Sequence, residues 1–191
     1  RIISLLLVTT VAPMFVAGTP SWELVVAVLV GGYLMAGGAN AVNMYLDRDI
    51  DDRMARTRLR PLPSGRMQPR EVLAFGLLLA TGATYVFARF ANVLTAALAL
   101  GGFYFYVLLY TRWLKRTTPQ NIVIGGAAGA FPPLVGWAAV TGSLDLMAVY
   151  LFLIVFYWTP PHFWALALYK QQDYGRAGVP MAPLVWGELE T

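Results

Sequence analysis

The chain alternates between long apolar runs and short polar segments. Six runs are present, at Ile2–Ala17, Leu24–Leu46, Val72–Ala88, Val93–Tyr110, Ile122–Val140 and Leu146–Leu168. A helix needs roughly 17–25 residues to cross the hydrocarbon core of a bilayer, and most of the runs reach that length. The first run is short. The pattern therefore predicts an all-α integral membrane protein with a bundle of six transmembrane helices.

Composition indicates the same class. Hydrophobic residues make up 58% of the 191 residues and charged residues only 13%, against about 25% in a typical soluble domain. A net charge of +4 would suggest nucleic-acid binding in a soluble protein, but here the basic residues lie in short segments between apolar runs. The chain has no cysteine, which excludes disulfides, thiolate metal sites and a cysteine nucleophile.

The positions of the cations predict which helix ends face the cytoplasm. If Arg1 is cytoplasmic, Arg89 is the only one of the fourteen Lys and Arg residues on the outer side, which is a strong positive-inside signal. The membrane is then a bacterial plasma membrane or an organelle inner membrane. The segments expected on its cytoplasmic or matrix side are Asn43–Glu71, Thr111–Asn121 and Tyr169–Thr191.

Charge is concentrated in the first of these segments. Residues Asn43–Arg66 hold four of the ten carboxylates and six of the fourteen cations. Asn43, Asp47 and Asp51 recur every four residues, so on one helix they would share a face within an arc of about 80° and rise about 12 Å along it. Asp49 would point to the opposite side. The spacing predicts a row of oxygen ligands.

Arginines follow this row at once, at Arg53, Arg56, Arg58 and Arg60. Mg²⁺ takes carboxylate and amide oxygens while phosphate oxygens fill its remaining positions, and arginine forks bind further phosphate oxygens in pairs. The combination therefore predicts a site for a polyphosphate carried on Mg²⁺. The alternative is a solvated loop whose charges only orient the protein, but orientation has no use for regularly spaced acids.

A second polar group follows the sixth apolar run, within Tyr169–Leu184. Its charged and phenolic members are Lys170, Asp173, Tyr174 and Arg176. They would complete a metal–diphosphate site if they faced the first group across the mouth of the bundle. The simpler interpretation is a salt bridge between Lys170 and Asp173 at the rim. His162, the single histidine, either packs through a hydrogen bond or contacts a haem or metal.

Small residues and prolines inside the runs predict how the helices pack. Glycines in the second and fifth runs allow close backbone approach, and they are Gly31, Gly32, Gly37, Gly38, Gly125, Gly126 and Gly129. Pro132–Pro133 and Pro160–Pro161 are expected to break the hydrogen-bond ladders of their helices at membrane depth. Such breaks would favour a cavity inside the bundle.

Several blocks of this sequence resemble a known family. The pattern N-x-x-x-D-x-x-x-D at Asn43–Asp51, followed by R-T-x-x-R-P at Arg56–Pro61, is similar to the first aspartate-rich motif of the UbiA superfamily of intramembrane aromatic prenyltransferases. The blocks at Leu114–Trp137, Trp158–Leu168 and Asp173–Met181 look like the protoheme IX farnesyltransferase (haem O synthase) branch of that superfamily. Together they cover most of the chain in the order of the family.

The resemblance implies an enzyme that joins farnesyl diphosphate to a vinyl group of haem b, with water added, to give haem O for terminal oxidases. Members typically have nine transmembrane helices. The chain is therefore expected to be one prenyltransferase domain, residues 1–191, that holds the first six helices and is truncated at the C-terminus and slightly at the N-terminus. A haem A synthase acting downstream is the implied partner.

Residues and resemblance together assign roles to the charged side chains. The expected Mg²⁺ ligands are Asn43, Asp47, Asp51 and Asp173. The catalytic residues are Asp47, Asp51, Asp173 and Lys170, and the diphosphate ligands are Arg56, Arg60, Lys115 and Arg116. An allylic cation shielded from water would rest against Tyr110 or Tyr157, and His162 is the candidate haem contact. In the superfamily the second motif usually has two aspartates four apart, and Tyr169 takes the first position here.

Other functions fit parts of the pattern. A quinone-precursor ring could replace haem as the acceptor, because both need an apolar cavity and the charges do not choose between them. An anion transporter could use prolines and a basic rim, but its ionisable residues should line the midplane rather than one interface. A CDP-alcohol phosphatidyltransferase is set aside, because the later acids of its motif would fall at Pro69 and Leu73.

Overall fold

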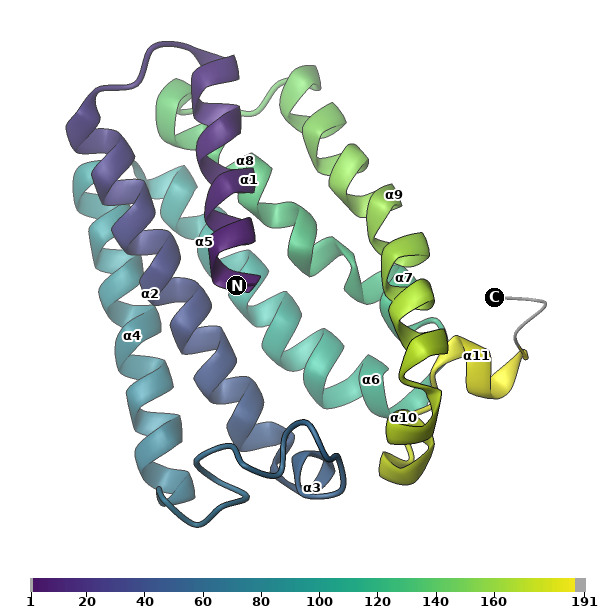
Figure 1. Cartoon of the computed structure of the whole chain (residues 1–191). Coiled ribbons are helices and arrows are strands. Elements are labelled where there is room, and N and C mark those ends of the chain that lie inside the picture. The colour runs from purple at the N-terminus through teal and green to yellow at the C-terminus, as the bar shows by residue number, and fades with distance from the viewer. Residues whose placement is uncertain (1, 188–191) are drawn as a thin grey trace.

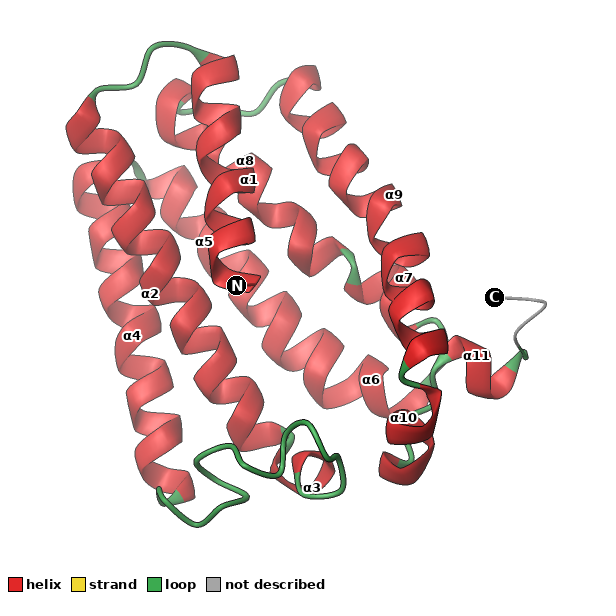
Figure 2. Ribbon diagram, viewed as in Figure 1, coloured by secondary structure: helices red, strands yellow, loops and turns green. Residues whose placement is uncertain are grey.

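The regular secondary structure of the described residues is helical. The structure, a computed structural model, describes residues 2–187, and no strand occurs in that range (Figures 1 and 2). The elements are α1 (Ile2–Ala17), α2 (Trp22–Leu46), α3 (Arg48–Asp51), α4 (Pro69–Phe90), α5 (Val93–Tyr104), the π-helix η1 (Phe105–Leu114), α6 (Lys115–Thr117), α7 (Asn121–Gly125), α8 (Ala127–Thr141), α9 (Leu146–Tyr169), α10 (Gln171–Ala177) and α11 (Ala182–Val185).

The predicted membrane architecture is confirmed. Within the described residues, five helical segments are long and apolar enough to cross a bilayer, at Trp22–Leu46, Pro69–Phe90, Val93–Thr117, Asn121–Thr141 and Leu146–Tyr169. The first predicted run forms α1, which is apolar but shorter than a full span. The protein is an all-α integral membrane protein, and the count of six helices holds when α1 is included.

Polar residues at helix ends determine where the spans begin and end. Ser21 caps α2, Asn92 caps α5 and Asp145 caps α9, each by accepting hydrogen bonds from backbone N–H groups of the first turn. Pro69 starts α4, where the N–H that proline lacks has no partner to lose. Gly142 ends α8 with a left-handed backbone, φ 68°. The connections that hold Ser21, Asn92 and Gly142 are short, whereas Pro69 follows the longer segment 52–68.

One predicted span boundary is wrong. Both α8 and α9 continue as helices through Pro132–Pro133 and Pro160–Pro161, which lack the N–H groups that would complete the hydrogen-bond ladder. The fifth span is interrupted earlier, at Gly126 between α7 and α8. The fourth span does not end at Tyr110, since η1 and α6 carry it on to Thr117. This extension brings Lys115 and Arg116 onto the same span.

Small residues set the distance between the helices, as the sequence predicts. In the α2–α4 contact, a Cβ added at Gly38 would lie 2.7 Å from the carbonyl oxygen of Gly76. In the α1–α8 contact, Gly136 lies directly against the backbone of Thr10. Side chains such as Val28 and Phe87 fill the core between these close approaches. Direct backbone contact lets helices pack tightly where lipid provides no hydrophobic driving force.

A second apolar cluster lies at the end of the bundle that we call the charged end, which carries residues 47–68, 112–120 and 170–181 (Figure 1). The cluster comprises Ile50, Met54, Ile122, Ala167, Ala177, Val179 and Met181. Ile50 and Met54 come from the first polar segment, and Val179 and Met181 from the second. Apolar packing therefore holds the two segments with predicted chemistry together.

The close α2–α4 contact makes a testable prediction for Gly76→Ala. A Cβ at this position would lie 2.8 Å from Val42 Cγ2 and 3.0 Å from the carbonyl oxygen of Gly38, so the helices must separate. We expect the free energy of unfolding in detergent to fall by about 1–3 kcal/mol. Gly82→Ala on the same helix is the control, because no atom lies within 4 Å of the added Cβ. Equal stability of the two variants would contradict the packing described here.

Candidate active site

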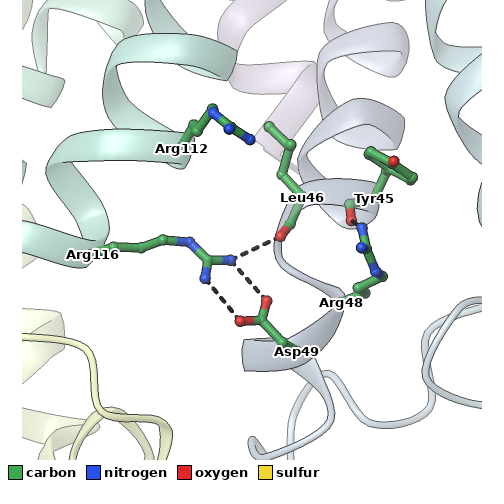
Figure 3. Close-up of a pocket in the computed structure, with 6 residues that line it drawn as sticks. All are labelled: Tyr45, Leu46, Arg48, Asp49, Arg112 and Arg116. Carbon is green, nitrogen blue, oxygen red and sulfur yellow. Dashed lines mark hydrogen bonds and ion pairs between the residues drawn. The ribbon is translucent and has the colours of Figure 1, made fainter.

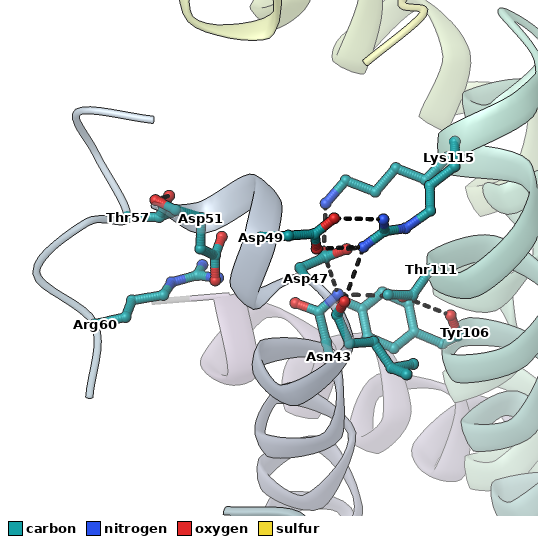
Figure 4. Close-up of polar contacts among 11 residues, drawn as sticks. Asn43, Asp47, Asp49, Asp51, Thr57, Arg60, Tyr106, Thr111 and Lys115 are labelled. Carbon is teal, nitrogen blue, oxygen red and sulfur yellow. Dashed lines mark hydrogen bonds and ion pairs between the residues drawn. The ribbon is translucent and has the colours of Figure 1, made fainter. Parts of the chain in front are cut away.

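The carboxylate of Asp47 is the centre of a buried polar network at the end of α2 (Figure 4). Asp47 has no exposed surface, and Asn43 one turn earlier is 8% exposed. Asn43 Nδ2 donates to Asp47 Oδ2 at 2.9 Å and to Thr111 Oγ1 at 3.1 Å. Thr111 Oγ1 donates in turn to the carbonyl of Tyr106, five residues back in the π-helix. The network therefore joins α2 to η1.

Two cations from the end of the fourth span neutralise this carboxylate. Lys115 Nζ lies 2.5 Å from Asp47 Oδ2, and Arg116 Nη2 lies 3.6 Å from Oδ1. The Lys115 side chain is only 15% exposed, which weakens solvent screening of the pair. Within residues 2–187, Asp47 Oδ1 has no hydrogen-bond partner. A buried carboxylate oxygen without a donor is available to a ligand.

Arg116 is held more firmly by the neighbouring acid, Asp49. Its two terminal nitrogens each donate to one oxygen of Asp49 at 2.8 Å, and Nη2 also donates to the carbonyl of Leu46 at 2.8 Å (Figure 3). The hydrogen bonds from Arg116 to Asp49, together with the positive charge of Arg116 and opposed in part by burial, lower the pKa of Asp49 to about 2. Asp49 is therefore ionised at neutral pH and fixes the position of Arg116.

Asp51 forms a second, separate pair with the loop that follows α3. The carboxylate is 3% exposed, and Arg60 Nη1 donates to its Oδ2 at 2.7 Å. Thr57 Oγ1 donates to the Asp51 carbonyl at 2.8 Å, so the loop folds back over the end of α3. Figure 4 shows the Asp51–Arg60 pair beside the network around Asp47. Two buried acids at the charged end thus each have a cation within contact distance.

The prediction that Asn43, Asp47 and Asp51 share one face of a continuous helix is wrong in one respect. The helix ends at Leu46, and Asp47 lies between α2 and the single turn of α3. The helical period therefore does not run unbroken through the motif, and Asp49 does not point away from Asp47, because Arg116 contacts both acids. Asn43 and Asp47 lie in contact as predicted. Asp51 has its own cation instead of a place in the same network.

The other predicted site residues lie apart from this network. Asp173 is half-buried on α10, and within the described residues it forms no ion pair, either with the first motif or with Lys170. Lys170 lies over the ring of Tyr169 at 4.7 Å. Arg56 is exposed, and its side chain has no ion pair in residues 2–187. The alternative salt bridge at the rim is therefore not present either.

The predicted aromatic and histidine positions divide between the inside and outside of the bundle. Tyr110 packs on the bare backbone of Gly125, and its ring stacks 5.7 Å from that of Tyr106, close to the Asp47 network. Tyr157 is 70% exposed on α9. His162 is also exposed on α9, with its ring stacked 4.3 Å from Trp158, so the interpretation as a buried hydrogen-bonded residue is wrong.

Sequence reasoning missed Thr111 and the role of Asp49. Thr111 precedes Lys115 by four residues, and that spacing could have placed its hydroxyl on the same side of the helix. No comparable signal existed for Asp49, because the spacing argument assumed that the helix continued past Leu46. Thr57 was likewise unpredictable, since its bond to Asp51 depends on the path of a loop.

The residues present suit a magnesium ion bound with its substrate. Within residues 2–187, no three Asp, Glu, His or Cys side chains converge closely enough to hold a metal alone. Mg²⁺ usually takes one or two carboxylates and fills its other positions with substrate phosphates and water, so a full protein cage is not required. The free Oδ1 of the buried Asp47 and the carboxylate of Asp51 provide such oxygens.

Comparison with known protein families shows to which family the chain belongs. The sequence model of the UbiA prenyltransferase family matches residues 5–191, nearly the whole chain. The chain belongs to the UbiA prenyltransferase family. The predicted resemblance is confirmed, and the Asn43–Asp47 contact lies where the aspartate-rich motif of that superfamily was expected.

This UbiA-family chain has close relatives named protoheme IX farnesyltransferase. Over 100% of the chain, it is 59% identical to the protein of Roseiflexus castenholzii, 60% to that of Chloroflexus aurantiacus and 60% to that of Symbiobacterium thermophilum. The alignments cover 36%, 33% and 64% of those three proteins. The chain therefore spans about a third of the first two and less than two thirds of the third.

Solved structures share the UbiA fold. A UbiA homolog from Archaeoglobus fulgidus, solved bound to DMAPP and Mg²⁺, superposes with a TM-score of 0.77 over 98% of this chain and 68% of the homolog. Sequence identity is 17%. The same homolog bound to GPP and Mg²⁺ gives an identical TM-score. At this identity the likeness establishes the arrangement of the helices.

The buried network predicts a stability effect for Thr111→Val. Valine keeps the shape of the fully buried threonine but leaves Asn43 Nδ2 without one of its two acceptors. We expect the free energy of unfolding in detergent to fall by about 1–3 kcal/mol. Thr81→Val is the control, because that hydroxyl is exposed and bonds only to its own helix, and it should stay within about 0.5 kcal/mol. A neutral Thr111→Val would show that the bond contributes nothing.

Proposed function

We propose that this chain is a membrane-embedded prenyltransferase domain that transfers a farnesyl group from farnesyl diphosphate to a vinyl group of haem b, giving haem O. The observation that carries the proposal is identity of 59–60% across the whole chain, both polar segments included, with proteins named protoheme IX farnesyltransferase. The buried acids and cations at the charged end supply the chemistry that such a reaction needs.

The first step requires stabilisation of a leaving diphosphate. Asp47 and Asp51, with the amide oxygen of Asn43, would hold Mg²⁺, and the solved homolog that binds DMAPP with Mg²⁺ supports this assignment. Mg²⁺ supplies positive charge at the diphosphate oxygens as the carbon–oxygen bond breaks. We keep Asp173 and Lys170 as further members of the site, because α10 packs in the same apolar cluster as Ile50.

The cations that now neutralise the acids are positioned to bind the diphosphate. Lys115, Arg116 and Arg60 each contact a carboxylate and remain 15%, 33% and 33% exposed. When a metal ion compensates these acids, the three cations can turn part of their hydrogen-bonding capacity to phosphate oxygens. Arg56 would be a fourth cation for the diphosphate. Unlike the other three, it is exposed and forms no ion pair in residues 2–187. Charge developing on the leaving oxygens would thus be stabilised by groups already in place.

Carbon–carbon bond formation follows loss of the diphosphate. The π-electron pair of the vinyl group attacks C1 of the farnesyl cation, and water adds to the other vinyl carbon with loss of a proton, which leaves a hydroxyl group. The products are haem O, diphosphate and a proton. The apolar helices would exclude water until this step, and the ring of Tyr110, which stacks on Tyr106, would stabilise the cation. Exposed Tyr157 is less well placed for that role.

The distribution of charge supports a cytoplasmic or matrix location for the active site. Eleven of the fourteen cations lie within the charged end, and Arg89 at the C-terminal turn of α4 lies at the opposite end. This asymmetry matches the positive-inside rule. The same concentration of ionisable residues at one interface argues against an anion transporter, whose charges would line the midplane. The proposed membrane is a bacterial plasma membrane or an organelle inner membrane.

Haem b is the proposed acceptor, and a quinone-precursor ring is the second candidate. The names of the relatives favour haem, while the charges at the site would serve either acceptor. His162 stays a candidate haem contact through its exposed ring on α9. A haem A synthase acting downstream is the proposed consumer of the product.

Acceptor identity is tested by supplying both acceptors. Membranes containing the chain are incubated with farnesyl diphosphate, Mg²⁺ and either haem b or 4-hydroxybenzoate, and products are identified by mass spectrometry. We expect a haem product heavier by one farnesyl group and one hydroxyl group, and no prenylated benzoate. Prenylation of the benzoate alone would replace haem with a quinone precursor. Prenylation of neither acceptor would remove the proposal for this chain.

The role of Asp47 is tested by Asp47→Asn. The amide keeps the size of the side chain but removes the charge that would hold the metal, so turnover should fall by about 100-fold or more. Asp52→Asn is the matched control, because Asp52 directly follows the motif but is exposed and has no ion pair in residues 2–187. Its turnover should match that of the parent chain. Undiminished turnover in Asp47→Asn would refute the metal site.

A further inference from the structure

A basic pocket opens beside the candidate active site, at the end of α2. It has a volume of about 500 Å³ and lies between the end of α2 with α3 and the end of the fourth span (Figure 3). Its lining consists of Tyr45, Leu46, Arg48, Asp49, Arg112 and Arg116. Three arginines and one carboxylate therefore face one opening. Asp47 and Lys115 do not line it.

The positive charge of this pocket is largely uncompensated. The single carboxylate, Asp49, is already bound at both oxygens by Arg116. Neither Arg48 nor Arg112 forms an ion pair with any carboxylate in the part of the chain that the structure describes. Both are exposed. The pocket thus carries a surplus of two positive charges in reach of an incoming anion.

A purely structural role accounts for two of the arginines only. Arg48 donates to the carbonyl of Tyr45 at 2.7 Å and lies 4.7 Å from its ring centre, and Arg116 donates to the carbonyl of Leu46. Both therefore satisfy carbonyls that the end of α2 leaves free. Within residues 2–187 the Arg112 side chain forms no hydrogen bond or ion pair, although it points toward Leu46 across the pocket. Its charge has no structural use there.

The pocket lies at the depth of lipid headgroups. Leu46 is the last residue of one membrane segment, and Arg112 and Arg116 belong to the last six residues of another, Val93–Thr117. Trp113, next to Arg112, is 58% exposed, as is typical of aromatic residues at a membrane interface. Basic pockets between membrane helices at this depth bind anionic headgroups.

We infer that this pocket is a binding site for a phosphate group at the membrane surface, with Arg112 and Arg48 as its ligands and Arg116 as a fixed positive charge. Arginine forks match phosphate oxygens in pairs, and Leu46 provides an apolar wall beside them. That wall favours the headgroup of an anionic phospholipid over a free phosphate anion, which would gain nothing from it. The pocket shares Arg116 with the Asp47 network, whereas Arg48 and Arg112 form no ion pair with Asp47 in residues 2–187, so the proposal does not depend on the proposed reaction.

The test compares lipid retention in single arginine variants. The purified chain is equilibrated in a neutral detergent with phosphatidylglycerol or phosphatidylcholine, and bound lipid is counted by native mass spectrometry. We expect Arg112→Gln to reduce phosphatidylglycerol affinity about fivefold, and Arg48→Gln to a similar extent. Phosphatidylcholine should bind weakly to all variants. Because Arg112 has no ion pair in the described residues, its variant should fold normally, which its melting temperature checks.

Arg58→Gln is the matched control. Arg58 is exposed at the same end of the bundle, has no ion pair in residues 2–187 and does not line the pocket, so its variant removes the same charge elsewhere. Its lipid affinity should equal that of the parent chain. Equal losses in Arg58→Gln and Arg112→Gln, or no loss in Arg112→Gln, would overturn the site.

Competition identifies the source of the phosphate. If inorganic diphosphate, with or without Mg²⁺, leaves the Arg112-dependent phosphatidylglycerol bound, the site recognises a lipid headgroup. If diphosphate displaces that lipid from the parent chain, the same arginines serve a free phosphate anion. Prenyl-transfer activity of Arg112→Gln should be unchanged in neutral detergent, because in residues 2–187 the Arg112 side chain forms no hydrogen bond or ion pair with a member of the Asp47 network.

Discussion

The burial of Asp47 is the constraint on which the charged end depends. A carboxylate with no exposed surface at the end of a membrane helix would lose its hydration at a cost of several kcal/mol if it had no partners. Lys115, Arg116 and Asn43 offset that cost. Since the cations are 68 and 69 residues away in sequence, the pairing fixes α2 against the end of the fourth span. The position of the first motif is therefore set by long-range electrostatics.

Apolar packing provides the second constraint, and it leaves the charges free for chemistry. The cluster of Ile50, Met54, Val179 and Met181 joins the two polar segments without using any acid of either motif. Asn121 adds a bond from its Nδ2 to the carbonyl of Pro180 at 3.2 Å. Ligand binding can consequently rearrange ion pairs at the mouth of the bundle while the segments that carry them stay in place.

Much of this arrangement could be predicted from the sequence, because the dominant signals are local. Apolar run length determines the spans, and the cation distribution identifies the charged end. The contact between Asn43 and Asp47 follows from a four-residue spacing inside a helix. Prediction failed at Asp49, where the helix had already ended, and at the π-helix, which carries the fourth span beyond Tyr110. Pairings such as Asp49 with Arg116 depend on tertiary packing, which no local pattern encodes.

The charges at the mouth of the bundle favour joint binding of a cation and a polyanion. Asp47, Asp49 and Asp51 are balanced by Lys115, Arg116 and Arg60, so these six side chains together carry no net charge. A divalent cation binding alone would meet three resident cations, and a diphosphate binding alone would meet three carboxylates. When both bind, the metal faces the acids and the phosphates face the cations, so each unfavourable contact is replaced by a favourable one. A balanced set of ion pairs therefore selects for the metal–diphosphate complex over either component.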